Sequence, residues 1–282
     1  MIAVVDYQKG NLKSVERGLI AAGGEAFITA DASEIAKADA IVLPGVGAFA
    51  DAAATMCELG QMEVIRERVR AGVPFLGICL GEHLMFEHGV EGAPEGSPAC
   101  GLGLLPGTVV AMPRCDEQGT AFKVPHVGWN TIEMPACNGG AAAPPCGEGG
   151  GNAVLSSGGV GGGAARSSAA KRGLFEHGAF LDSTPQPGGD LAFPGSTTQP
   201  GSEPAFACPL FDGIAPGEYF YFTHSYIAPT GSHTIAETTH SVRFTSAVQF
   251  GERAFGVQFH PEKSSDAGAR VLANFVAIAA RG

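Results

Sequence analysis

Short apolar runs alternate with amphipathic stretches along the first 80 residues. The runs predict buried strands at Ile2–Val5, Ala26–Thr29, Ala40–Leu43 and Val73–Ile78. Between them, helices are predicted over 12–20, near 33–36, and over 49–71 with an interruption at Gly60. The first of these helices ends at Gly23-Gly24, as is usual for glycine at a helix C-terminus. Repeated strand–helix units of this kind imply right-handed crossovers and a mainly parallel sheet.

The later part of the chain is richer in strand patterns. Strands are predicted at Leu104-Leu105, Val109–Met112, Pro125–Ile132, Tyr219–Phe222, Ile235–Thr238, Ala247–Phe250 and Ala254–Phe259. A closing helix is predicted over Ser265–Ala279, where the apolar positions recur at helical spacing. We therefore expect an α/β fold: a mostly parallel central sheet flanked by helices, with an antiparallel extension.

A stretch of different composition divides the chain. Residues 139–201 hold 17 of the 42 glycines, together with several prolines and Ser/Thr clusters. Such a segment buries too little apolar surface to offset its backbone entropy. We predict that 135–207 is a mostly disordered insertion and that 1–134 with 208–282 form one domain of about 209 residues.

Composition excludes several classes of protein. The net charge is −11 and no basic run occurs, which argues against nucleic acid and membrane surfaces as partners. The apolar stretches are too short to span a bilayer, and Met1–Asp6 lacks the basic start of a signal peptide, so a cytoplasmic protein is expected. Seven scattered cysteines without a Cys-x-x-Cys pair indicate reduced thiols and no metal site.

The strongest chemical signal lies at Gly77-x-Cys79-x-Gly81. The apolar strand ends at Cys79, and the apolar residues 84–86 predict the start of a helix. A residue at such a strand-to-helix turn is held in a strained, exposed position, and the two glycines allow the backbone to pack closely around it. The helix N-terminus favours a thiolate. Cys79 is therefore a candidate nucleophile, the alternative being a buried structural cysteine.

A cysteine nucleophile needs a base, and the base needs an orienting group. His260 closes an apolar strand, Pro261 suits the first position of the closing helix, and Glu262 can turn back toward the imidazole. The other histidines have no such acidic neighbour or lie in surface-like contexts. Backbone N–H groups of Gly45, Val46 and Gly47, with that of Leu80, are candidates to bind an oxyanion. The alternative for residues 44–47 is a plain turn.

These residues carry a resemblance. Gly77-x-Cys79-x-Gly81 with His260-Pro261-Glu262 resembles the class I, or triad, glutamine amidotransferases, and further stretches are similar to the glutaminase subunits of imidazole glycerol phosphate synthase. These stretches are Asp6-Tyr7 with Gly10-Asn11 and Ser14-Val15, then 44–49, 124–130, 219–226 and 259–264. The resemblance covers nearly all of the chain outside the insertion.

The resemblance implies a function and a set of roles. Cys79, His260 and Glu262 would form the triad, Gly45, Val46 and Gly47 the oxyanion strand, and His224, Ser225 and Tyr226 the glutamine site. The chain would hydrolyse L-glutamine without a cofactor and pass ammonia to a (β/α)8-barrel cyclase subunit in histidine biosynthesis. Positions matching the interface with that subunit are Asn11, Val127, Trp129, Asn130, Tyr221 and Lys263.

The sequence departs from the family pattern beside the nucleophile. The family usually has glutamine where this chain has His83, and an apolar residue where it has Glu82. The family's glutamine contacts the substrate, so His83 is expected to alter glutamine affinity rather than the reaction class. Two alternatives stay open: another class I amidotransferase or Cys-His hydrolase, and a non-catalytic binding subunit with a changed glutamine pocket.

Overall fold

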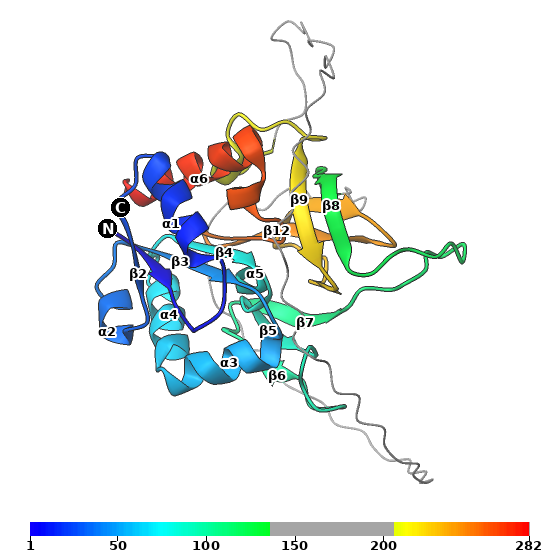
Figure 1. Ribbon diagram of the computed structural model, residues 1–282, viewed down its shortest axis with the longest axis horizontal. Helices are drawn as coiled ribbons and strands as arrows, with labels where there is room; N and C mark the ends of the chain where they lie inside the picture. The colour runs from blue at the N-terminus through cyan, green and yellow to red at the C-terminus, as the bar shows by residue number, and fades with distance from the viewer. Residues whose placement is uncertain (136–205, 282) are drawn as a thin grey trace, which may run out of the picture. The chain divides into compact units, whose positions relative to one another are not determined.

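A computed structural model describes residues 1–135 and 206–281. The predicted insertion, 135–207, falls almost wholly outside the described residues. The central element is a seven-stranded sheet with strand order β11-β12-β13-β4-β3-β1-β2 (Figure 1). Its parallel part comprises β1 (Ile2–Val5), β2 (Ala26–Thr29), β3 (Ala40–Gly45), β4 (Phe75–Cys79) and β13 (Ala254–Val257). The antiparallel extension comprises β12 (Arg243–Phe250) and β11 (Thr234–Thr239), so the expected fold class is confirmed.

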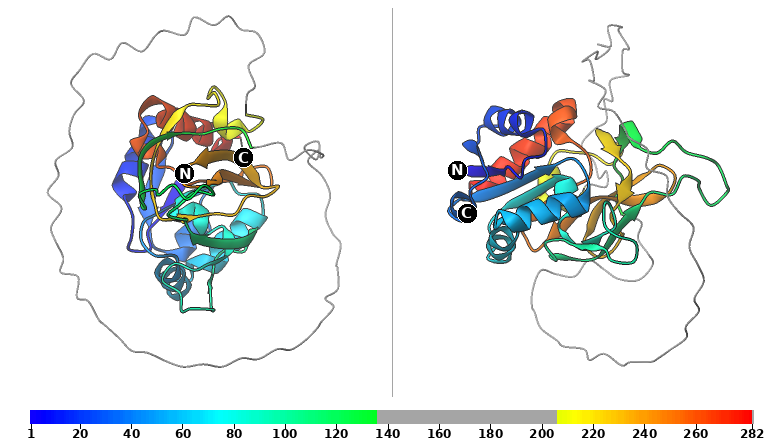
Figure 2. Two further views of the ribbon diagram at one scale, coloured as in Figure 1. Left: turned by 90° about the vertical axis from the view of Figure 1, so that its right-hand side faces the viewer. Right: turned by 60° about the horizontal axis from the view of Figure 1, so that its bottom comes forward.

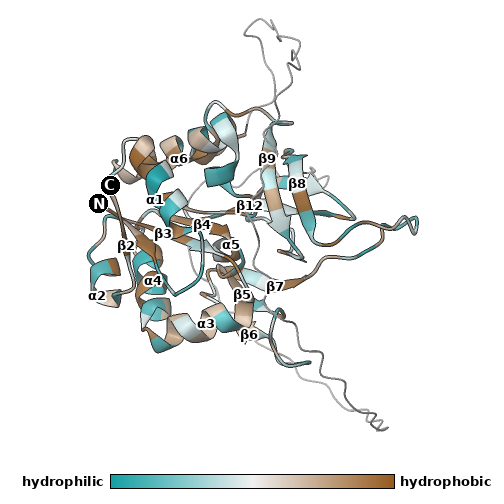
Figure 3. Cartoon of the chain, viewed as in Figure 1, coloured by the Kyte–Doolittle hydropathy of each residue, from teal (hydrophilic) through white to brown (hydrophobic). Residues whose placement is uncertain are grey.

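Helices cover both faces of this sheet, because its strands are apolar on both sides. Alternate residues of one strand enter different clusters: Ile2 and Val4 pack with α1 (Leu12–Ala21) and α6 (Ser265–Ala279), whereas Val5 packs on the other face. That other face is covered by α2 (Ala32–Ile35), α3 (Phe49–Glu58) and α4 (Gln61–Arg70) (Figures 1 and 2). The hydropathy colouring places brown segments at β3 between helices that carry both colours (Figure 3). The domain therefore has two hydrophobic clusters, one on each face of the sheet.

Two smaller sheets flank the parallel one. One has the order β10-β7-β5-β6 and contains Tyr226–Ile227, Leu105–Ala111, Phe86–Gly89 and Ala99–Cys100. The other is an antiparallel ribbon of β8 (His126–Thr131) and β9 (Tyr219–His224). Single 3-10 turns occur at η1 (Pro209–Phe211) and η2 (Pro261–Lys263). In the described part of the chain, no helix combines the length and apolar character needed to cross a membrane.

The structure corrects the sequence-based assignment in two places and confirms it in a third. The helix expected to begin at residues 84–86 is the short α5 (Leu80–His83), and Phe86 already starts a strand. The closing helix begins at Ser265, after the separate turn η2, so Pro261 is not its first residue. The interruption expected at Gly60 is confirmed, because Gly60 separates α3 from α4 with a positive φ of 67°.

Candidate active site

Cys79 occupies a strained turn at the carboxyl end of β4. Its φ is +53°, in the region that side chains rarely adopt, and α5 begins at the next residue. A Cβ added to Gly77 would lie 2.5 Å from the carbonyl oxygen of Gly81, and one added to Gly81 would lie 1.8 Å from that of Leu43. Only glycine fits either position. The predicted strain is present, but the predicted exposure is wrong: Cys79 is only 7% exposed, although it lines a pocket.

His260 and Glu262 form a buried pair at the end of the neighbouring strand. Because Val257 of β13 pairs with Ile78 of β4, the residues that follow these strands emerge at the same edge of the sheet. His260 Nδ1 lies 2.9 Å from Glu262 Oε1, with both side chains almost fully buried. The Ser264 hydroxyl donates to the His260 carbonyl at 2.7 Å and holds the turn.

The electrostatics couple His260 to Cys79. Burial by itself lowers the pKa of His260, but hydrogen bonding to Cys79 and Glu262 and their negative charges outweigh it and raise the pKa to about 9. His260 Nε2 is buried, and no described group lies in a position to form a hydrogen bond of normal distance and angle with it. Glu262 thus holds the ring through Nδ1, and Nε2 is available to exchange a proton with Cys79 or a substrate.

The predicted oxyanion and substrate residues surround the sulfur. Gly45 pairs with Cys79 across β3 and β4. A cavity of about 280 Å³ beside Cys79 is lined by Val46, Gly47, Leu80, His83, Glu91, Pro125, Thr223, His224, Ser225 and Tyr226. Gly47 has a φ of +102°, and the N–H of Leu80 opens α5, where it lacks an intrahelical acceptor. The structure therefore brings the predicted oxyanion and substrate residues to one pocket, which Glu91, Pro125 and Thr223 also line.

The predicted interface residues divide into two groups. Val127 and Trp129 on β8 are 53% and 51% exposed, and Trp129 packs edge-on against Tyr221 of β9. The Lys263 ammonium lies 6.0 Å from the centre of the Tyr221 ring. We call Val127, Trp129, Tyr221 and Lys263 the ribbon patch. Asn11 lies elsewhere, at the start of α1, and Asn130 turns its amide inward.

Asn130 begins a row of hydrogen bonds that leads to the pocket. The Thr131 N–H donates to Asn130 Oδ1, so the Asn130 amide nitrogen faces His126 Nε2 at 3.3 Å and donates to it. His126 Nδ1 then donates to His224 Nε2 at 3.0 Å, and His224 Nδ1 donates to the Tyr226 carbonyl at 2.8 Å. Burial lowers the pKa of His126 to about 4 and that of His224 to about 3, so both rings are neutral.

Sequence reasoning missed Gln258 and the burial of Glu82. The Gln258 amide nitrogen lies 3.7 Å from Cys79 Sγ, and both Gln258 and Glu82 are completely buried. A polar residue inside the apolar run 254–259 was the available signal for Gln258. The five described cysteines, Cys57, Cys79, Cys100, Cys115 and Cys208, are free, as expected; Cys137 and Cys146 lie outside the described residues.

The fold and this geometry are those of a glutamine amidotransferase. The family model "Glutamine amidotransferase class-I" matches residues 3–134 and 190–279, and the chain belongs to this family. Solved structures agree in fold: a glutamine amidotransferase crystal structure is 14% identical with a TM-score of 0.56, covering 99% of this chain and all of that one. PurLQS from Thermotoga maritima, also 14% identical, has a TM-score of 0.54, with 98% of this chain and 97% of that chain covered.

Within this class the chain belongs to the HisH subunits. It is 35% identical to the imidazole glycerol phosphate synthase subunit HisH of Moorella thermoacetica, over 97% of this chain and 93% of that protein. It is 32% identical to the HisH subunit of Syntrophotalea carbinolica over 98% of each chain. The HisH subunit of Rhodopirellula baltica is 33% identical, over 98% of this chain and 96% of that protein.

Proposed function

We propose that this chain is the glutaminase subunit of an imidazole glycerol phosphate synthase and that Cys79, His260 and Glu262 are its catalytic triad. The observation that carries the proposal is the strained Cys79 beside the buried His260–Glu262 pair, at a pocket of about 280 Å³. Its similarity to HisH subunits over nearly the full length supports the specific assignment. The pocket suits a substrate as small as one amino acid.

The proposed reaction proceeds through a thioester. The Cys79 thiolate attacks the side-chain amide carbon of glutamine, and N–H groups from residues 45–47 and Leu80 stabilise the oxyanion. The His260 imidazolium gives its proton to the amide nitrogen, so that ammonia leaves and the thioester remains. His260, now neutral, takes a proton from water as that water attacks the thioester. Glutamate departs, and the thiolate–imidazolium pair is restored.

The remaining pocket residues are assigned to substrate recognition. His224, Ser225 and Tyr226 form one wall of the pocket and would hold the α-amino and carboxylate groups of glutamine, partly through backbone groups. His83, on the helix that follows the nucleophile, also lines the pocket. The proposal needs neither a metal ion nor an organic cofactor, because Cys79, His260 and the amides supply nucleophile, acid and oxyanion site.

The proposed partner is a (β/α)8-barrel cyclase subunit in the cytoplasm. The ribbon patch supports a protein partner, because exposed aromatic and aliphatic side chains with a flanking cation are typical of interfaces. Ammonia would pass from Cys79 to the cyclase through a protected channel in the heterodimer. Asn11 and Asn130 belong to the same proposed interface.

The test is glutamate release by the purified chain, with and without a cognate barrel subunit and its ribotide ligand. We expect weak hydrolysis alone and stimulation of at least about tenfold by the liganded barrel, equivalent to about 1.4 kcal/mol in the barrier. Lys263→Ala should reduce this stimulation more than it reduces synthesis from added ammonia. Fast hydrolysis that ignores the barrel would contradict the proposal and favour an independent hydrolase.

A further inference from the structure

Three polar residues lie in the core beneath the candidate nucleophile. Glu82, His83 and Gln258 are 0%, 3% and 0% exposed. His83 Nε2 lies 2.7 Å from Gln258 Oε1, and Gln258 Nε2 lies 3.7 Å from Cys79 Sγ. Burying a polar group costs free energy unless it forms hydrogen bonds in the interior. Gln258, which directly follows β13, contacts the sulfur, and His83 of α5 contacts Gln258, so these hydrogen bonds reach Cys79 without His260.

The chemistry of the sulfur sets the direction of these hydrogen bonds. A thiolate can only accept, so Gln258 must present its NH₂ group to Cys79 and its carbonyl oxygen to His83. That oxygen also only accepts, so His83 must carry its proton on Nε2. The row therefore runs from His83 through Gln258 to the sulfur, each group donating to the next. A hydrogen bond donated to a charged form stabilises that form.

The Glu82 carboxyl group is compatible with a thiolate at Cys79 because it is neutral. Glu82 Oε2 lies 3.6 Å from His83 Nε2, and neither Glu82 oxygen has a hydrogen-bond partner among the described residues. Burial raises the pKa of Glu82 well above its usual value and lowers that of His83 to about 4. The two side chains are thus a neutral acid beside a neutral ring, not an ion pair. A protonated Glu82 adds no negative charge next to the thiolate.

We propose that Gln258 is a further catalytic residue that stabilises the Cys79 thiolate, and that His83 is the positioning residue that holds the Gln258 amide in its donating orientation. This inference rests on the proposed function only in taking Cys79 as the nucleophile. It assigns His83, a departure from the family pattern, a role behind the nucleophile in addition to its place at the pocket wall. Glu82 contributes by remaining protonated.

The test measures the thiolate directly and needs neither glutamine nor a partner. The full chain is alkylated with iodoacetamide across a pH range, and the label on Cys79 is quantified by mass spectrometry. Gln258→Met keeps the length of the side chain but has no N–H to donate. We expect the pH of half-maximal alkylation of Cys79 to rise by about one unit or more. The exposed Cys57 serves as an internal control and should keep its profile.

Variants at His83 separate positioning from packing. His83→Phe fills the same space without a donor and should raise the alkylation midpoint in the same direction, by less than Gln258→Met does. His83→Gln, whose amide nitrogen can replace Nε2, should restore the original midpoint. Glu82→Gln replaces a neutral acid with a neutral amide and should move the midpoint by less than about 0.3 units, a twofold change.

The outcomes separate this inference from the proposed function. An unchanged midpoint in both folded variants, Gln258→Met and His83→Phe, would overturn the thiolate-stabilising role even if the barrel stimulates glutamate release. A shifted midpoint supports it even if no barrel does. Should Gln258→Met fail to fold by circular dichroism, the pair His83→Phe and His83→Gln decides: a shift with rescue supports the role, and no shift overturns it.

Discussion

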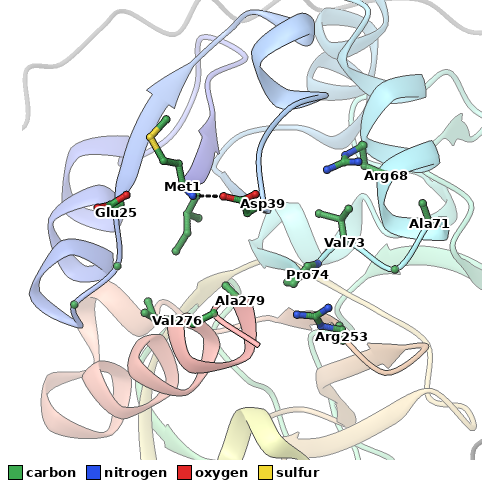
Figure 4. A pocket seen from close by; sticks show the side chains of 15 residues that line it. Met1, Glu25, Asp39, Arg68, Ala71, Val73, Pro74, Arg253, Val276 and Ala279 are labelled. Atoms are coloured by element: carbon green, nitrogen blue, oxygen red, sulfur yellow. Dashed lines mark hydrogen bonds and ion pairs between the residues drawn. The ribbon is translucent and has the colours of Figure 1, made fainter. Parts of the chain in front are cut away.

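The parallel sheet has a cavity at each end, and the two cavities differ in the chemistry of their side chains as well as in volume. The larger cavity, about 600 Å³, lies at the amino end, between the starts of β1 and β4 and the end of α6 (Figure 4). The cavity beside Cys79 at the carboxyl end has about half that volume. The candidate chemistry nevertheless gathers entirely at the smaller one, as is general for sheets of this type.

Three charged side chains at the amino end bind the chain terminus or backbone carbonyls, although Arg68 Nε itself has no hydrogen-bond partner among the described residues. Asp39 pairs with the Met1 ammonium at 2.5 Å (Figure 4). Arg68 donates to the Ala38 carbonyl, and Arg253 donates to the Ile278 carbonyl. At the carboxyl end, by contrast, His260 Nε2 lacks a full hydrogen bond and Cys79 has a strained backbone. Groups left strained and unpaired in a pocket mark a reactive site better than its size does.

The sharpest way to test this contrast is to remove the nucleophile. Cys79→Ala should lower barrel-stimulated glutamate release by at least about 10⁴-fold, because no other group can form the thioester. Synthesis from added ammonia by the barrel should survive. The matched control is Cys57→Ala on the exposed side of α3, which should keep full activity. Equal loss in both variants would mean that neither cysteine is specific to the chemistry.

Removing the carboxylate that orients His260 should have the next largest effect. Glu262→Gln should lower kcat/KM by about 10²–10⁴-fold, because the ring loses its charged partner. Since the pKa of His260 is raised to about 9, the wild-type imidazolium persists through neutral pH, and kcat/KM should decline only as the pH approaches 9. In the variant this decline should move to lower pH. An unmoved pH profile would show that Glu262 does not set the charge of His260.

Alanine substitution of one glycine at each end of the sheet measures how much unfolding free energy an added methyl group costs there. Gly81→Ala would force its Cβ to within 1.8 Å of the Leu43 carbonyl and should cost about 3 kcal/mol of unfolding free energy. Gly72, which lines the amino-end cavity, has open space around it but a φ of +87°, so Gly72→Ala should cost only about 1 kcal/mol. Urea unfolding of both variants measures the difference. Similar values would indicate that the turn at Gly81 is no more tightly packed than the amino end of the sheet.

The smallest effect on activity is expected at the amino end itself. Arg253→Met removes the hydrogen bond to the Ile278 carbonyl and should lower the unfolding free energy by about 1 kcal/mol. Glutamate release should stay within twofold of the wild type. A tenfold loss of activity in a folded variant would show that the larger cavity takes part in the function after all.

The sequence allowed the carboxyl-end site to be predicted because the relevant signals are local. Gly77, Cys79 and Gly81 fix one turn, and His260 and Glu262 lie two residues apart, so each contact is set by a few residues of backbone. The parallel order of β13, β4 and β3 then brings the separate turns together. The strands of the central sheet were predictable for the same reason, since each is a short apolar run between turn residues.

The misses arose where the outcome depends on distant packing. The apolar residues 84–86 fit the pattern of a helix or of a strand equally well. Phe86 is in a strand because it pairs with Leu105 of β7. Glu82 is a charged residue type in the sequence, but its burial against Gly256 depends on β13, which packs against α5. Gln258 was overlooked because its partners, His83 and Cys79, lie about 175 residues earlier in the chain.

The row from Asn130 to Tyr226 has a consequence for how the surface and the pocket communicate. Both of its ends are fixed by backbone groups: the Thr131 N–H can only give a proton, and the Tyr226 carbonyl can only receive one. Between them, His126 and His224 have no freedom of tautomer, and both must keep the hydrogen on Nδ1. Every hydrogen bond in the row therefore donates in the same direction, from Asn130 toward Tyr226. A partner that turned the Asn130 amide over would place its Oδ1, which can only accept, against the unprotonated Nε2 of His126. If both rings then exchanged tautomer, an unprotonated His224 Nδ1 would face the Tyr226 carbonyl, so the row resists reversal.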